Sequence, residues 1–165
     1  MKAISIRQPW VDAVLYGGKR VENRGPRWGR CKHRGPLLLH AAKGMTDDEY
    51  HEACEFMREQ GIAWRPDRNN LRQFVRGAIV GVTEVIDIVT PGGQRVDFPT
   101  LNVRDDEWYT GGFGLVFGPT HAFDAPIPYK GNLSLFNVPD ELVAEAIRKI
   151  HPHGQRSFMH GDGGL

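Results

Sequence analysis

Short strand-like segments separated by glycine and proline constrain the fold of this chain more than any other feature of its sequence. The longest, residues 77–89, is rich in Val and Ile and ends before Pro91-Gly92-Gly93. We expect the strand near residue 115 to end at Gly118-Pro119, because both residues interrupt strand pairing. Apolar alternation and β-branched content predict strands at 2–6, 20–24, 36–41, 77–89, 113–117 and 134–138.

Three segments carry the signals of helices. The first starts at Gln8-Pro9-Trp10, where proline suits the opening turn, and ends at Gly17-Gly18. The second begins at Thr46, with Glu49 three residues later as in a capping box, and ends at Gly61. The third opens at Pro139, and its predicted inner face consists of Leu142, Val143, Ala146, Ile147 and Ile150.

These elements predict an α+β fold, a small and partly closed β-barrel flanked by helices. A doubly wound α/β sheet is disfavoured, because helices do not alternate with strands in the middle of the chain. The 165 residues fit one domain, which we expect over residues 1–150. Residues 151–165 have little apolar periodicity and are predicted to be a flexible C-terminal tail.

Several classes of protein are disfavoured at this point. No apolar run approaches the ~18 residues that cross a bilayer, and no N-terminal pattern marks export, so we expect a cytoplasmic protein without membrane partners. The only cysteines, Cys31 and Cys54, are too few for a disulfide scaffold, and their spacing with histidines matches no zinc motif. We therefore predict no metal and no cofactor.

Charge is distributed unevenly along a chain whose net charge is only +1. The first 40 residues contain nine Lys or Arg and two acids, Asp12 and Glu22. Residues 46–59 have the opposite pattern, with six acids and one Arg. The basic first 40 residues indicate either one positively charged face for an anionic partner or cations spread around a solvated surface.

The segment 19–24 has a pattern suited to a nucleotide. In an extended chain Glu22 and Arg24 lie on one face, together with Arg20. Carboxylates accept hydrogen bonds from exocyclic amines, and Arg and Lys bind phosphate or carbonyl oxygen. The alternative is a structural Glu–Arg pair.

Two further groups are candidates for binding. At the Gln8-Pro9-Trp10 corner the amide can read a base edge and the indole can stack on a base, unless both are structural. His40 and Lys43 follow a buried strand, with small residues between them. The alternatives are a structural histidine and a solvated lysine.

The chain resembles the ASCH domain family of the PUA-like superfamily over about residues 2–140. The resemblance rests on 4–10 (ISIRQPW), 17–24 (GGKRVENR), 38–43 (LLHAAK), 76–85 (RGAIVGVTEV) and 126–136 (PIPYKGNLSLF). It implies a barrel of five or six strands with a cleft beside the first helix. It also implies binding of RNA or nucleotides, although some relatives are N4-acetylcytidine amidohydrolases or ribonucleases. The positions that line the family's cleft are Gln8, Pro9, Trp10, Lys19, Glu22, Arg24, His40 and Lys43, with Tyr129 and Lys130 in a turn that reaches it.

The sequence departs from the hydrolase subgroup, which has Thr three residues after the motif lysine, where this chain has Glu22. Our first hypothesis is therefore a module that binds RNA or a modified or unmodified nucleotide, with stacking by Trp10, Trp28 or Trp108. The alternative is a metal-free hydrolase of an N-acylated cytidine or an RNA phosphodiester, with Lys19, Glu22 and His40 catalytic. A third hypothesis is a protein adaptor that uses the acidic helix 46–60. Protein partners and oligomeric state stay open.

Overall fold

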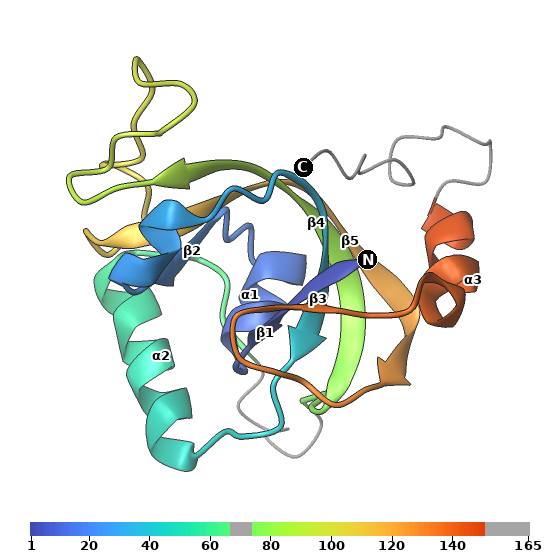
Figure 1. Ribbon diagram of the computed structural model, residues 1–165. Helices are drawn as coiled ribbons and strands as arrows, with labels where there is room; N and C mark the ends of the chain where they lie inside the picture. Colours follow the sequence, from blue (N-terminus) through green and yellow to red (C-terminus); the bar gives the residue numbers. More distant parts are fainter. Residues whose placement is uncertain (67–73, 151–165) are drawn as a thin grey trace.

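The computed structural model describes residues 1–66 and 74–150. Its strands are β1 (Lys2–Ile6), β2 (Val21–Arg24), β3 (Gly35–Ala41), β4 (Ala78–Val89), β5 (Phe113–Pro128) and β6 (Leu135–Asn137). Its helices are α1 (Trp10–Tyr16), α2 (Asp47–Glu59) and α3 (Asp140–Ile150), with a 3-10 turn, η1, at Pro26–Arg30. The sheet curls into an open barrel (Figure 1), which confirms the α+β, PUA-like fold. The predicted tail, 151–165, lies outside the described residues.

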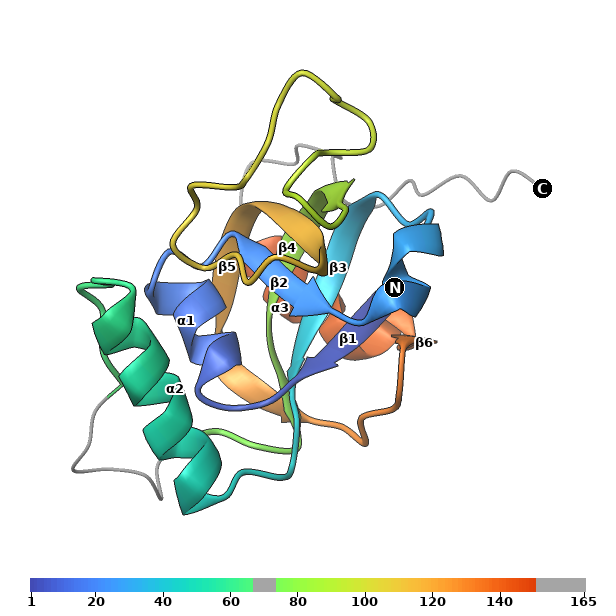
Figure 2. The same ribbon diagram turned by 90° about the vertical axis from the view of Figure 1, so that its left-hand side faces the viewer.

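The sheet has the order β2-β5-β4-β3-β1-β6. β1 pairs with β3 in parallel, and every other neighbouring pair is antiparallel. Helices α1 and α2 lie on one side of the sheet and α3 on the other, as the two views show (Figures 1 and 2). The capping box predicted for α2 is present, since Thr46 Oγ1 accepts from Glu49 N and Glu49 Oε2 accepts from Thr46 N.

The predicted end of the fifth strand is wrong. β5 continues through Gly118-Pro119 to Pro128 and pairs with β4 over most of its length. Its register shifts between Thr83 and Val85 of β4, opposite these two residues. β2 pairs only with the first part of β5, up to Val116. The missing N–H of Pro119 is tolerated there, because proline is accommodated at bulges and unpaired edges.

Alternation along β1 separates two hydrophobic layers. Ile4 and Ile6 belong to the layer that packs against α1, whereas Ala3 belongs to the layer that packs against α3. Ser5 therefore points to the α3 side of the sheet, as does His40, its partner in the parallel register with β3. This alternation decides which candidate residues can meet. No helix within residues 1–66 and 74–150 has the length and apolar character needed to span a membrane.

Candidate functional site

A chain of ion pairs connects three residues of the predicted motif. Lys19 Nζ lies 2.9 Å from Glu22 Oε2 and also donates to the carbonyl oxygen of Val21. Arg24 Nη2 lies 3.1 Å from Glu22 Oε1 and donates to the carbonyl oxygen of Ser5 at 3.0 Å. Lys19 and Glu22 are only 3% and 7% exposed. Their charges are compensated by each other and by Arg24, which makes their burial tolerable.

The first cavity of the candidate site, which we call the aromatic cavity, has a volume of about 320 Å³ and lies between α1, β2 and α2. It is lined by Trp10, Lys19, Glu22, Asn23, Glu49, Glu52, Ala53, Phe56 and Thr110. Trp10 and Phe56 form an edge-to-face pair with ring centroids 5.6 Å apart. Glu49 is paired with Arg7, whereas Glu52 has no ion-pair partner in the described part of the chain. The cavity therefore combines an indole with an accessible carboxylate.

The second cavity, which we call the basic cavity, has a volume of about 680 Å³ and lies at the ends of β1, β3 and β5. It is lined by Ser5, His40, Ala42, Lys43, Arg76, Gly77, Tyr129, Lys130, Gly131, Asn132 and Leu133. The cations Lys43, Arg76 and Lys130 form no ion pair within residues 1–66 and 74–150, and no acidic residue lines the cavity. Its charge is therefore positive and available to an anion.

His40 connects the wall of the basic cavity to the neighbouring turn. It is 1% exposed, its Nδ1 lies 3.0 Å from Ser5 Oγ, and its Nε2 lies 2.9 Å from the carbonyl oxygen of Tyr129. Burial lowers the pKa of His40 below 6.5, against the opposing effect of the hydrogen bond to Tyr129. A carbonyl only accepts, so the neutral ring carries its proton on Nε2, and Nδ1 accepts from the Ser5 hydroxyl.

The single cleft expected from the resemblance is thus divided between two faces of the sheet. Trp10, Lys19 and Glu22 line the aromatic cavity, whereas the other four lining candidates line the basic cavity: His40, Lys43, Tyr129 and Lys130. Arg7 lies between them. Its guanidinium contacts Glu49 of the aromatic cavity, and a Cβ on Gly44, next to Lys43, would lie 3.2 Å from its Nη2.

The three remaining candidates lie outside the lining of both cavities. Gln8 is buried, and its amide nitrogen donates to Asp12 Oδ1 at 2.8 Å and to the carbonyl oxygen of Val75 at 3.0 Å. Pro9 is buried at the N-cap of α1. Arg24 packs over the ring of Trp28, with its Cζ 5.1 Å from the ring centroid. None of the three lines either cavity.

The cavities narrow two expectations, one about the stacking residue and one about the basic segment. Trp28 and Trp108 are 6% and 2% exposed and pack in hydrophobic clusters, so of the three proposed stacking residues only Trp10 lines a cavity. None of the nine cations in the first 40 residues lines the basic cavity. That cavity takes its charge from Lys43, Arg76 and Lys130 instead. These three cations lie in separate segments of the sequence, and the tertiary fold brings them together at the basic cavity.

Sequence reasoning missed several residues that line the basic cavity, chiefly Ser5 and Arg76. Ser5 looks like an ordinary strand residue until the parallel register places it opposite His40. Arg76 begins one of the segments that carry the resemblance, but its local pattern did not mark it as a binding residue. In the described ranges, no group of three or more His, Cys, Asp or Glu side chains is placed to hold a metal ion.

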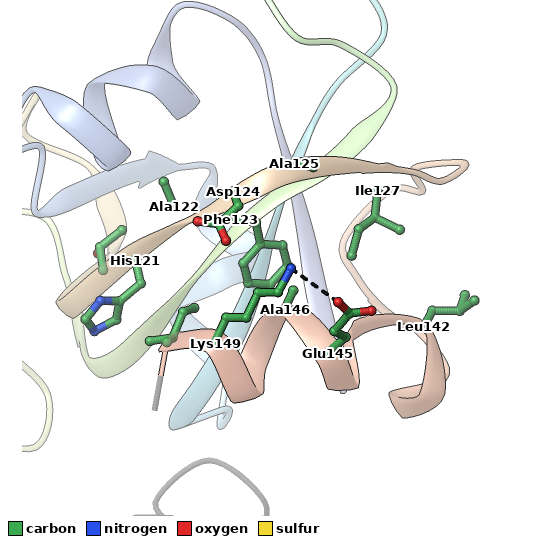
Figure 3. Close-up of a pocket in the computed structure, with 12 residues that line it drawn as sticks. His121, Ala122, Phe123, Asp124, Ala125, Ile127, Leu142, Glu145, Ala146 and Lys149 are labelled. Carbon is green, nitrogen blue, oxygen red and sulfur yellow. Dashed lines mark ion pairs between the residues drawn. The ribbon is translucent and has the colours of Figure 1, made fainter. Parts of the chain in front are cut away.

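A third hollow, of about 610 Å³, lies between the second half of β5 and α3 (Figure 3). Phe123 forms part of its wall, and its Lys149 is paired with Glu145 at 3.2 Å. None of the candidate residues lines this hollow, and the charge of its one lysine, Lys149, is compensated by Glu145. Lys149 is therefore a suitable control for substitutions in the basic cavity.

Comparison with known proteins identifies the family. The chain is similar to "Activating signal cointegrator 1" of Homo sapiens, with 22% identity over 156 residues, or 94% of this chain and 24% of that protein. The Mus musculus protein of the same name is 24% identical over the same length and coverage. The chain thus spans about a quarter of the length of these relatives. The family description "ASCH domain" matches residues 4–100, more than half of the chain. The chain belongs to the ASCH domain family.

Proposed function

We propose that this protein binds RNA or a nucleotide, and that the phosphate occupies the basic cavity. The observation that carries the proposal is the convergence of Lys43, Arg76 and Lys130, without ion-pair partners in the described residues, on a cavity with no acidic lining. Unpaired cations around a hollow attract phosphate and release counterions when it binds. Membership of a family that generally binds RNA supports the same class of ligand.

We assign the base to the aromatic cavity, where Trp10 offers a stacking surface. Lys19 uses two of its three N–H donors on Val21 and Glu22, which leaves one for a carbonyl oxygen of a base. Glu52 supplies an acceptor for an exocyclic amine. Arg7 lies between the two cavities, beside the path of an RNA strand that would reach from one cavity to the other. Gln8, Pro9 and Arg24 act as positioning residues.

Fluorescence anisotropy with short labelled single-stranded RNA, its DNA counterpart and single nucleotides tests this proposal. We expect saturable binding of RNA at ~50 mM salt that weakens steeply toward ~200 mM, as counterion release requires. The double variant Lys43→Ala/Lys130→Ala should weaken binding and flatten the salt dependence, whereas Lys149→Ala should leave both unchanged. Absence of saturable binding to every probe at low salt would refute the proposed function.

The alternative of a hydrolase built on Lys19 and Glu22 has weaker support. Both groups are committed to the ion-pair chain with Arg24, in which each charge compensates its neighbour. A general acid or base must be able to exchange its proton with the substrate. The proposed role of this pair is therefore to bind and orient.

A further inference from the structure

We infer that Ser5 and His40 form a nucleophile–base pair in the basic cavity, for acyl transfer from a carboxylic ester that carries a phosphate. The inference extends the proposed function and rests on it, because the cations that would hold the phosphate of a nucleotide line the same cavity. It adds a reaction at a serine that no part of the family resemblance singled out.

The geometry of the pair is that of an oriented general base. Ser5 Oγ lies 3.0 Å from His40 Nδ1, within the range for proton transfer from a nucleophile to its base. On the other side of the ring, Nε2 lies 2.9 Å from the carbonyl oxygen of Tyr129. That carbonyl fixes the tautomer in which Nδ1 is free to take a proton, the role that a third group has in a catalytic triad.

Ser5 is also partly exposed, and the cavity that the pair lines is positively charged. Ser5 lines the cavity together with His40, so its side chain borders the space in which an ester would bind. Burial keeps the imidazole neutral near pH 7, as a base requires. Lys43, Arg76 and Lys130 line the same cavity, where they would hold the phosphate and favour the negative charge of a tetrahedral intermediate.

The reaction is balanced without a metal or a redox partner. Ser5 Oγ bonds to the ester carbonyl carbon while its proton passes to His40 Nδ1. The bond from that carbon to the alcohol oxygen then breaks, and the alcohol takes the proton from Nδ1. Water then attacks the carbonyl carbon of the acyl-serine while one of its protons passes to His40 Nδ1. The bond from that carbon to Ser5 Oγ breaks, and Oγ takes the proton from Nδ1. The products are the carboxylic acid and the alcohol.

Covalent labelling of the full chain tests the pair independently of RNA binding, because the probe is uncharged. We expect an alkyl fluorophosphonate to modify Ser5, as located by peptide mass spectrometry. Ser5→Ala should abolish the label, and His40→Gln should slow it by ~10²–10⁴-fold, the usual contribution of a general base. Ser134→Gly is the matched control, since it removes an exposed hydroxyl at a backbone φ of 60° that suits glycine.

A second variant keeps the test valid if His40→Gln does not fold. In Ser5→Cys the introduced thiol should react with iodoacetamide faster than Cys31 and Cys54 of the same molecule, because a neighbouring imidazole activates a thiol. A serine that only ties β1 to β3 would give no such difference.

Hydrolysis of an O-acetylated adenosine 5′-monophosphate, compared with O-acetylated adenosine, then tests the substrate class. We expect turnover of the phosphorylated ester to exceed that of the uncharged one and to vanish in Ser5→Ala. An unmodified Ser5, together with an unreactive introduced thiol in Ser5→Cys, would overturn the nucleophile–base pair, even if RNA binding persists. Loss of RNA binding with Ser5 still labelled would instead overturn the proposed function alone.

Discussion

The ammonium of Lys19 lies 2.9 Å from the carboxylate of Glu22, and both groups are almost completely buried. Arg24 lies on the other oxygen of the same carboxylate, so the carboxylate sits between two cations. The motif that most specifically suggested a ligand site therefore also neutralises its own charges. It contributes to both the wall of the aromatic cavity and the stability of the fold.

Substitution of Glu22 by Gln should destabilise the protein by about 3–5 kcal/mol, the usual cost of leaving a buried charge without its partner. The cost arises mainly because no negative charge would then compensate the buried ammonium of Lys19. Urea unfolding followed by circular dichroism measures this change. Glu59→Gln, at the exposed end of α2, should change the free energy of unfolding by less than ~0.5 kcal/mol. Equal stability of the two variants would contradict the proposed role of the ion-pair chain.

Gly131→Ala should displace the turn over the basic cavity. A Cβ at this position would lie 2.4 Å from His40 Cε1 and 2.6 Å from Ser5 Oγ, which is too close for either contact. We expect a loss of about 1–3 kcal/mol in stability, typical of overpacking, together with weaker RNA binding. Gly25→Ala is the control, because a Cβ there meets nothing within 4 Å. A Gly131→Ala protein with unchanged stability and affinity would show that the turn moves freely.

Stability should depend on pH through His40. Burial lowers its pKa below 6.5 in the folded protein, so the unfolded chain binds the proton first as the pH falls. The free energy of unfolding should decrease as the pH falls from 6.5 toward the lower folded value. In His40→Gln this dependence should become flatter. His33, whose pKa is also lowered mainly by burial, should retain part of it. A profile identical to that of the parent would contradict this assignment.

Asp87 should account for part of the sensitivity to acid. Its burial raises the pKa, but hydrogen bonds from Asp97 N, Arg95 and Ile88 N outweigh this effect and hold the pKa below 3.8. The stability that it contributes is present above 3.8 and is lost as the pH falls through the lower folded value.

Asp87→Asn should accordingly be less stable at neutral pH, and its unfolding free energy should fall less on acidification below 3.8. Urea midpoints measured across this range check the prediction. Asp124→Asn, at an exposed position of β5, serves as the control. An acid profile of Asp87→Asn that is as steep as that of the parent would count against it.

Substitutions in the two cavities should change RNA binding in different ways. Trp10→Ala should weaken binding by about 1–3 kcal/mol, the contribution of one stacked base, without changing the salt dependence. Arg76→Ala should instead reduce the slope of log K against log salt by about 0.7, the value for one phosphate contact on a single strand. Salt series on both variants separate the two effects. If both variants changed only the slope, the assignment of the base to the aromatic cavity would fail.

The local pattern was sufficient to predict most secondary structure. Thr46 and Glu49 mark the start of α2 because a capping box satisfies backbone groups within four residues. The alternation in 2–6 and the β-branched run in 77–89 predict β1 and β4 for equally local reasons. The end of β5 was wrong because tolerance of Pro119 depends on whether a neighbouring strand needs its N–H, which β2 decides.

Periodicity was enough to indicate most strands and helices, and short motifs were enough to indicate the family. The motifs also indicated seven of the residues that line the two cavities. The division of those residues between two cavities rather than one followed from strand pairing, since alternation sends Ser5 and Ile6 to opposite faces of the sheet. Strand pairing also brought Lys43, Arg76 and Lys130 together from distant segments. Charges that are far apart along the chain converge here because β3, β4 and β5 pair side by side, and no local pattern records that pairing.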